Sequence, residues 1–506
     1  MAHVLELTDG TTTINLTSGA TTTAWATSTG YTAGNHVAND NAYYVCTANH
    51  TSGATTEPGT GANWLSYWAL VAAFTPMYAP NTPDLSMQES QVSSISDGGE
   101  IPLTTRRNVT ETAELVIVAG TKAIMQANVQ AIEQMLLNAE RRQRWGTGSR
   151  VYIQAQFDGE SGKWRSEILA GRVEVTSDSM QLWSNSRIPA RLHITRRHYW
   201  ESTTLSELSI STATNTTPAT GGVTVYVDHD SSGKDNYIQI ADTQVTGSIP
   251  GPAMILLQNT SGGSVAFTWW HLSNNAFDSP TTFDPFLMGT EAEEQTAESD
   301  GGQKITWASG GIDHSTAAFA WGLGATRLGV MAGQYWRALA TFAAYPAGGM
   351  YIRPSLQYKV GSAFYSLWHG EEILMDSLKV QDLGAIPMPA DTGNSQLYFV
   401  LTLRASGSGT ATVDFVQLQP NYEYRRLYQN GFSMADDAAV VDDGIEGVTY
   451  YLGGSDHWPI YVAYNKPIHL YPGVTQRIRV LNDATSWTAA RTLKAQVWYR
   501  PRRLTV

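Results

Sequence analysis

The sequence predicts a mainly β protein with one long helix, divided into several domains. Thr, Ser, Gly and Ala are abundant, charged residues make up only 15% of the 506 residues, and 16 Trp and 24 Tyr are present. This composition is typical of short strands joined by many turns. A chain of this length is expected to form about three or four domains.

The charge and the single cysteine weigh against several classes of protein. The net charge is −13, from 45 acidic and 32 basic residues, which is opposite to the charge of a typical nucleic-acid binder. Cys46 alone cannot form an intramolecular disulfide. The first ten residues do not resemble a signal peptide, and no apolar run reaches the roughly 18 residues of a membrane helix. We therefore expect no specific nucleic acid, no membrane insertion and assembly in the cytoplasm.

The first part of the chain predicts strands on either side of a single helix. Residues 4–7 and 13–16 are short apolar strands, residues 74–85 form a Pro-rich connector, and residues 115–118 form another strand. Residues 121–144 are expected to be helical because four apolar side chains recur at helical spacing. These are Met125, Val129, Ile132 and Leu136. Arginines 141, 142 and 144 favour the negative end of the helix dipole, and Gly146 is a plausible stop.

Hairpins follow the helix. Residues 151–157 alternate apolar and polar side chains as a half-buried strand does, residues 158–162 form a turn, and residues 163–175 return. Further strands are expected near 180–183 and 188–197. Arginine clusters at 141–144, 196–197 and 500–503 are expected to be solvated caps or salt bridges between subunits.

This order of elements, over residues 1–22 and 73–200, resembles the N-terminal domain of siphophage distal tail proteins. The segments GKWRSEILAGRVE (162–174) and RIPARLHITRRHYWE (187–201) carry much of the likeness. The resemblance implies a tail-tube-like β-sheet domain that forms a homo-oligomeric ring, six-fold in symmetry, at the tail tip of the virion. Its implied partners are the tail tube protein on one side and a tail hub or tape-measure protein on the other.

Residues 23–72 predict a small inserted β module. Seven large aromatics lie between positions 25 and 68 among Gly, Thr, Asn and Ser, which is little apolar mass for an ordinary core. The order of these residues is similar to that of the small carbohydrate-binding modules best known from chitinases, and this resemblance implies contact with host surface polysaccharide. We expect Tyr43, Tyr44 and Trp68 to be the exposed contact rings, and Trp25, Tyr31 and Trp64 to be packed inside. The alternative is that these rings form only the core of the module.

Beyond residue 202 the composition shifts and predicts β-sandwich or jelly-roll domains. We expect a β domain at 203–290, a jelly-roll-like domain at 291–420 and a C-terminal β segment at 421–506. Residues 411–420 look like the closing strand of carbohydrate-binding jelly rolls. The sequence leaves open whether 421–506 pairs with 203–290. Candidate exposed rings of the jelly roll, with core packing as the alternative, are Trp336, Tyr351, Tyr365 and Trp368.

The sequence predicts neither a metal site nor catalysis. Asp228, Asp230 and Ser232 approach the spacing of a calcium loop, but Gln239 stands where Glu is needed, so we expect an ordinary turn. Nucleophile, zinc-protease and phosphate-loop motifs are missing. The acidic pairs 371–372, 436–437 and 442–443 are expected in solvated loops. We therefore expect no cofactor and no enzymatic activity.

Three functions remain open. The first is a structural tail-tip protein, a distal tail ring that bears host-glycan-binding decorations. The second is a receptor-binding or adhesin protein that recognises surface polysaccharide, and the third is a polysaccharide hydrolase. The helix-and-hairpin region at 73–200 favours the first, and the expected absence of a signal peptide argues against the third.

Overall fold

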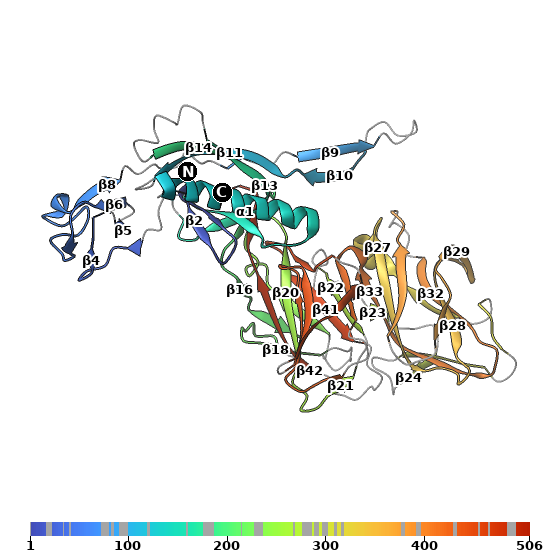
Figure 1. Ribbon diagram of the computed structural model, residues 1–506. Coiled ribbons are helices and arrows are strands. Elements are labelled where there is room, and N and C mark those ends of the chain that lie inside the picture. Colours follow the sequence, from blue (N-terminus) through green and yellow to red (C-terminus); the bar gives the residue numbers. More distant parts are fainter. Residues whose placement is uncertain are drawn as a thin grey trace. The chain divides into compact units, whose positions relative to one another are not determined.

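The protein divides into two compact units in the computed structural model (Figure 1). Unit 1 comprises Met1–Thr204 with Arg502–Val506, and unit 2 comprises Leu205–Pro501. The described residues are 2–16, 23–33, 35–39, 42–71, 80–81, 85–90, 100–118, 122–157, 160–175, 187–213, 215–226, 236–266, 269–275, 286–287, 293–295, 302–307, 311–314, 318–375, 380–390, 396–428, 433–453, 456–463, 466–482 and 492–505. Strands dominate in both units, so the predicted fold class, mainly β with one long helix, is confirmed.

Unit 1 contains an eight-stranded antiparallel sheet. Its main order is β11 (Val109–Val118), β14 (Arg187–Arg196), β13 (Trp164–Val175), β12 (Val151–Phe157), β1 (Ala2–Thr8) and β2 (Thr13–Asn15), with β15 (Trp200–Ser202) and β43 (Arg502–Arg503) attached beside β13. The strands expected around residues 4–7, 13–16, 115–118, 151–157 and 188–197 are therefore confirmed. A separate ribbon of β9 (Leu85–Ser90) and β10 (Glu100–Arg106) was not predicted.

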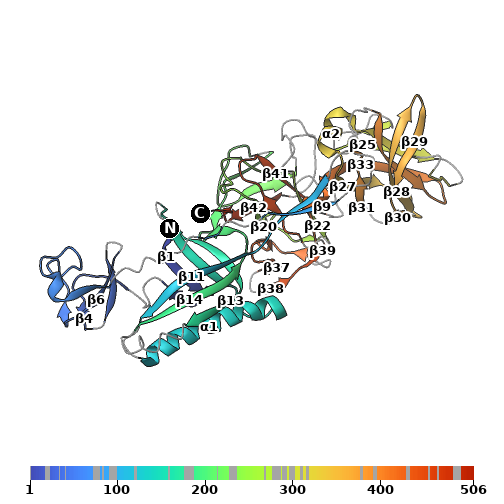
Figure 2. The same cartoon turned by 90° about the horizontal axis from the view of Figure 1, so that it is seen from above.

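The helix α1 (Lys122–Trp145) lies along this sheet (Figure 2). Ile132 and Leu136 enter the core of the sheet, as their spacing predicts, and Val129 packs at its margin. Gly171 of β13 is needed at the contact, because a Cβ there would lie 2.9 Å from the Leu136 side chain and 2.8 Å from the His193 carbonyl. Gly146, with φ of +68°, ends the helix as expected.

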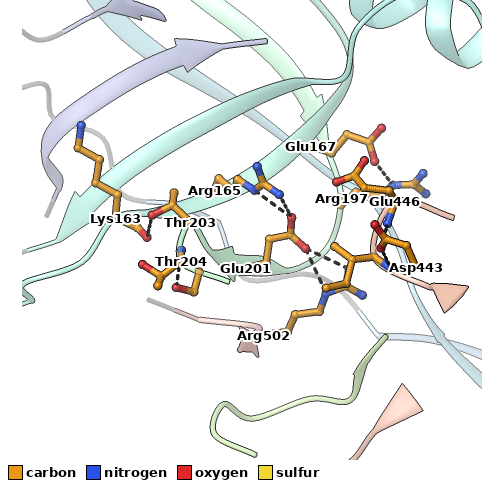
Figure 3. Close-up of polar contacts among 12 residues, drawn as sticks. Lys163, Arg165, Glu167, Arg197, Glu201, Thr203, Thr204, Asp443, Glu446 and Arg502 are labelled. Carbon is orange, nitrogen blue, oxygen red and sulfur yellow. Dashed lines mark hydrogen bonds and ion pairs between the residues drawn. The ribbon is translucent and has the colours of Figure 1, made fainter. Parts of the chain in front are cut away.

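The last strand of the chain returns to unit 1 through ion pairs (Figure 3). The Glu201 carboxylate accepts from Arg165 and from Arg502, each at 3.0 Å. Arg503 pairs with Glu160 and lies over the Trp164 ring at 3.7 Å. The expectation that these C-terminal arginines are solvated or reserved for another subunit is therefore wrong, since their partners lie within unit 1.

Arg196 also departs from its expected place as an exposed residue. Its side chain is fully buried and pairs with Glu111 of β11 at 2.7 Å, and it also donates to the Asn81 carbonyl at 3.1 Å. The guanidinium lies 4.6 Å from the Trp200 ring. This pair therefore joins two strands and the segment that follows the aromatic module.

We expect Glu111→Gln to weaken the sheet far more than Glu114→Gln on the same strand. Glu111→Gln leaves the Arg196 charge buried without its carboxylate, which typically costs about 3–5 kcal/mol. Glu114 pairs with Arg191 at 3.4 Å on the exposed face, so its loss should cost less than about 1 kcal/mol. Hydrogen exchange of the β11 and β14 amides, which reports their opening free energy, measures both. Equal effects would contradict the role given to Arg196.

Residues 23–71 of unit 1 form two small sheets. One has the order β3 (Thr23–Ala24), β5 (His36–Asn39), β6 (Ala42–Cys46) and β8 (Trp68–Val71), and the other pairs β4 (Gly30–Tyr31) with β7 (His50–Thr51). A single 3₁₀ turn, η1 (Trp64–Ser66), precedes β8. Strands this short need side-chain packing to hold them, which explains why the module carries so many aromatic rings.

Unit 2 contains two β-sandwiches. The first sandwich takes strands from both ends of the unit. One sheet holds β16 (Ser206–Glu207), β42 (Thr492–Tyr499), β20 (Gly251–Asn259), β36 (Ala439–Asp443), β37 (Val448–Gly453) and β38 (Asp456–Pro459), with β18 (Val223–Tyr226) and β40 (His469–Leu470) at its sides. The other holds β17 (Ile210–Thr212), β19 (Tyr237–Ile240), β41 (Gln476–Asn482), β22 (Trp269–Asn274), β34 (Tyr424–Tyr428) and β39 (Tyr461–Ala463). A ribbon of β21 (Val265–Ala266) and β35 (Ser433–Met434) accompanies them.

The second sandwich lies between these strands in sequence. One sheet holds β24 (Glu293–Gln295), β25 (Gly302–Trp307), β33 (Gly409–Pro420), β27 (Tyr335–Ala344) and β31 (Gln381–Pro387), with β23 (Phe286–Leu287) beside β33. The other holds β26 (Ala318–Gly322), β32 (Leu397–Arg404), β28 (Met350–Val360) and β29 (Ala363–His369), with β30 (Ile373–Met375) beside β28. A short helix that was not predicted, α2 (Gly324–Met331), packs Leu328 and Met331 into the shared core. A 3₁₀ turn, η4 (Asn421–Glu423), leads back to the first sandwich.

A buried polar network joins the two sandwiches. Asp382 of β31 accepts two hydrogen bonds from Arg337, at 2.8 and 2.7 Å, and one from Arg426 of β34 at 3.2 Å. Burial opposes ionisation of Asp382, but Arg337 holds the pKa of this carboxyl below its usual range. Tyr424 Oη lies 3.5 Å from Asp382 and 2.6 Å from His271 Nδ1. Burial lowers the pKa of His271 to about 3, so its imidazole is neutral in the folded protein.

His271 therefore gives unit 2 an acid sensitivity with a defined sign. The unfolded histidine takes up a proton near pH 6.5 and the folded one near pH 3, so its contribution to stability is complete above pH 6.5 and falls as the pH drops toward 3. The slope approaches about 1.4 kcal/mol per pH unit. We expect His271→Gln to flatten the loss of unit 2 stability between pH 6.5 and 4.5, measured by hydrogen exchange of β22 and β34. That window lies above the range in which Asp382 titrates. An unchanged slope would contradict this.

Candidate functional site

The aromatic module turns its largest rings inward. Trp68 is 1% exposed and Tyr44 is 5% exposed, so the expectation that they are exposed contact rings is wrong. Both pack with Tyr31, Val37 and Cys46 because the module has few aliphatic side chains with which to build a core. The Trp68 indole N–H donates to the Thr56 carbonyl at 2.9 Å, which satisfies its polar atom inside. Tyr31 is buried, as expected.

The rings at the module surface are a different set. Trp25, Trp64 and Tyr67 are half-buried and pack against the core from outside. Trp25 and Trp64 were expected inside, and Tyr67 was not chosen as a contact residue. The structure describes only the backbone of Tyr43, which pairs with Ala38 and Val71.

His50 belongs with these surface rings, although sequence reasoning did not select it. Its imidazole lies 4.5 Å from the Tyr67 ring at a tilt of 34°. Within the described residues, His50 Nε2 and Trp25 Nε1 are buried and have no hydrogen-bond partner. The half-buried rings offer faces on which sugar C–H groups can stack, whereas the two buried nitrogens are out of reach of a ligand. One feature of the sequence could have indicated His50, because this residue falls within the same motif as these rings.

Cys46 takes no part in such a surface. It is buried, it contacts the Ala48 carbonyl at 3.1 Å, and burial raises the pKa of its thiol. A thiol of this kind is a core side chain and a poor nucleophile.

The candidate rings of the second sandwich divide between core and surface. Trp336 is buried in the core, and Trp368 packs against it while half-buried. Tyr351 is half-buried beneath the Arg404 guanidinium, which lies 4.0 Å from its ring. Tyr365 is 59% exposed on β29. Of the four, only Tyr365 therefore offers most of its ring to solvent.

Glu372, beside these rings, is held by two donors. Arg404 donates to both carboxylate oxygens, at 2.7 and 2.6 Å, and His314 Nε2 lies 2.6 Å from Oε1. Hydrogen bonds from Arg404 and His314 lower the pKa of Glu372 to about 2. A carboxylate that stays ionised cannot serve as the acid of a glycosidase pair, and its neighbour Glu371 is exposed.

The other acidic pairs are also placed. Asp436 and Asp437 lie in an exposed turn, as expected. The expectation of a solvated loop is wrong for Asp442 and Asp443, which end strand β36. Asp442 is buried and accepts from Arg425 at 2.8 Å and from Thr449 at 2.7 Å, so it holds strands together. Strand alternation separates the two carboxylates, which do not form a catalytic pair.

Among the described residues, no group of three or more His, Cys, Asp or Glu side chains could hold a metal ion. The turn with Asp228 and Asp230 lies outside the described residues. No described helix is both long enough and apolar enough to cross a membrane.

Comparisons with known proteins gave matches among solved structures. No protein-family model matches the chain, and no curated protein matches it. One similar structure is Dit (gp 19.1) of SPP1, described as a paradigm of the hub adsorption apparatus in phages that infect Gram-positive bacteria. It is 8% identical, with 84% of this chain and 90% of that chain covered at a TM-score of 0.29.

A second similar structure is a chain of the phage P2 baseplate in its activated conformation with calcium. It is 9% identical, with 85% of this chain and 90% of that chain covered at a TM-score of 0.27. TM-scores this low do not establish a common fold. The argument for function therefore rests on the residues and strands of this chain.

Proposed function

We propose that this chain is a structural protein of a phage tail tip, a distal tail protein that forms a ring at the end of the tail tube. The observation that most supports this proposal is the arrangement of helix and sheet in unit 1. A single long helix covers an antiparallel sheet whose terminal strands, β11 and β2, each have one partner within the described residues. The aromatic module is inserted near the start of this unit, and unit 2 is inserted before its last strand.

Strand β11 is the proposed subunit contact. It is ten residues long and pairs with β14 along its whole length. The Asn81 side chain donates to the Thr110 carbonyl, and no described strand pairs with the other edge, where the remaining N–H and C=O groups could meet a neighbour. A neighbouring copy that pairs there would extend the sheet around a ring, and six copies would close it. The tail tube protein and a hub or tape-measure protein are the proposed partners above and below. The ring would assemble in the host cytoplasm and be carried in the virion.

A second part of the proposal concerns the host. The module of residues 23–71 would bind host surface polysaccharide through Trp25, Trp64, Tyr67 and His50, not through the buried Tyr44 and Trp68. Tyr43 remains a candidate contact. The competing function, a receptor-binding adhesin, shares this surface but needs no ring. The proposal includes no enzymatic step.

Ring assembly should depend on unit 1 with its C-terminal strand. We expect residues 1–204, joined to 502–506 by a flexible linker of about six residues, to form hexamers by mass photometry. Residues 1–204 alone should assemble less well, because Glu201 and Glu160 lose the partners that Arg502 and Arg503 supply. A linked variant that stays monomeric at high concentration would sink the ring, and a trimer would favour the adhesin.

Glycan binding should depend on Tyr67 and not on its apolar neighbour. Removing one stacking ring typically costs about 1–3 kcal/mol, so Tyr67→Ala should bind host polysaccharide about five- to 150-fold more weakly. Leu65→Ala is the matched control, because Leu65 is 75% exposed on the same 3₁₀ turn region but has no ring. Both variants should assemble normally. If Tyr67→Ala binds polysaccharide like the parent, or disrupts assembly instead, the module is not the glycan contact.

A further inference from the structure

The outer face of the second sandwich carries a polar surface that is distinct from the surface of the aromatic module. Along β28, Ile352 and Leu356 point into the core. Strand alternation places Tyr351 and Arg353, which are half-buried, on the opposite, outward face; Ser355 lies on that face too but is fully buried. In the strand register, Tyr351 pairs with Arg404 of β32, and Arg353 pairs with Thr402 of β32.

An ionic bridge crosses this face. His314 comes from the segment just after Ile312, which bridges to Ala405, and Glu372 comes from the turn between β29 and β30. The two side chains meet at 2.6 Å, and Arg404 joins them. The charge of Glu372 is thus already shared between Arg404 and His314.

Arg353 is the basic group that this bridge does not satisfy. Its Nε atom is buried, and within the described residues its guanidinium has neither a hydrogen-bond acceptor nor a carboxylate within ion-pairing distance. His314 Nδ1 is also buried without a partner. Thr402 uses its hydroxyl on the Arg353 carbonyl at 3.2 Å, so it does not serve the side chain. An unsatisfied buried guanidinium donor is costly, and a bound acceptor would remove that cost.

His369 is the third basic side chain, beside Arg353 and His314. It lies across from Ser355 in the strand register, and its Nε2 contacts Ser366 at 2.8 Å. Burial lowers the pKa of His369, and the charges of Arg353 and His314 lower it further, so the three basic side chains act on one another. The nearby acidic residues Asp313 and Glu371 are exposed.

We infer that Arg353, His369 and His314 bind the anionic substituent, a carboxylate or a phosphate, of a surface polysaccharide. A guanidinium presents a fork of donors that matches both groups. The inference rests on the proposed host-surface role for the polysaccharide class, and it assigns a site separate from the aromatic module.

The test compares the full chain with Arg353→Gln and with Lys359→Gln. Lys359 lies on the same strand, six residues further on, over the rings of Phe364 and Tyr398, so both variants remove one positive charge from β28. The probes are polygalacturonate for carboxylate, a glycerol-phosphate polymer for phosphate, and dextran as the neutral control. Loss of a charge-assisted contact should weaken binding about ten- to a hundredfold in Arg353→Gln. Lys359→Gln should change binding less than about twofold.

Further measurements keep the outcome interpretable. Hydrogen exchange of β28 and β32 checks that Arg353→Gln is folded, and Arg353→Lys should retain part of the binding because it keeps the charge but not the fork. If the parent retains neither charged polymer, or if Arg353→Gln and Lys359→Gln weaken binding equally, the inference is wrong. Ring assembly measured on the same samples separates the two claims. Intact rings without polymer binding would overturn this site and leave the tail-tip proposal standing.

Discussion

The sheet of unit 1 depends on one buried ion pair, between Arg196 of β14 and Glu111 of β11. The pair is costly to bury, and the structure offsets that cost with further contacts. Arg196 also donates to the Asn81 carbonyl, the Asn81 N–H donates to Glu111 at 3.0 Å, and the Trp200 ring lies against the guanidinium. The pair therefore fixes the strand at the sheet edge together with the segment that follows the aromatic module. The proposed ring contact can form only if that edge is held in place.

Local pattern predicted the elements of this sheet but not the partners of its charges. The helix expected at 121–144 is Lys122–Trp145, because the spacing of Ile132 and Leu136 is a property of one segment. The burial of Tyr44 and Trp68 was mispredicted, because the packing of the whole module decides which rings enter its core. Arg196 and Asp442 were also misplaced, because Glu111 and Arg425 reach them from distant strands. Strand alternation alone could have placed the Arg353 side chain on the outward face. Its lack of a carboxylate partner depends on how the loops near residues 314 and 372 are placed, which a local pattern does not predict.

The way the chain closes explains how large additions coexist with a small sheet. β43 pairs with β15, so residues 205–501 leave and re-enter unit 1 at adjacent strands. An insertion whose ends are neighbours adds little loop-closure cost and disturbs no strand order. Unit 2 is built in the same way. Strands of residues 206–274 and 424–499 share the sheets of the first sandwich, and the second sandwich is inserted between them in the sequence. The shared Asp382 network then ties the two sandwiches by buried charge, which needs fixed geometry to be tolerated.

The two surfaces assigned to polysaccharide work by different physical terms. The rings of Trp25, Trp64 and Tyr67 would contribute by stacking and desolvation, which salt affects little. Arg353 would contribute by charge on a chain whose net charge is −13, so a distant polyanion is repelled and only a close, well-oriented anionic group gains. Raising the ionic strength screens both the repulsion and the contact, but the half-buried contact is screened less. A surface of this kind would select for a particular substituent at short range, whereas the proposed site on the module would accept sugar rings of many kinds.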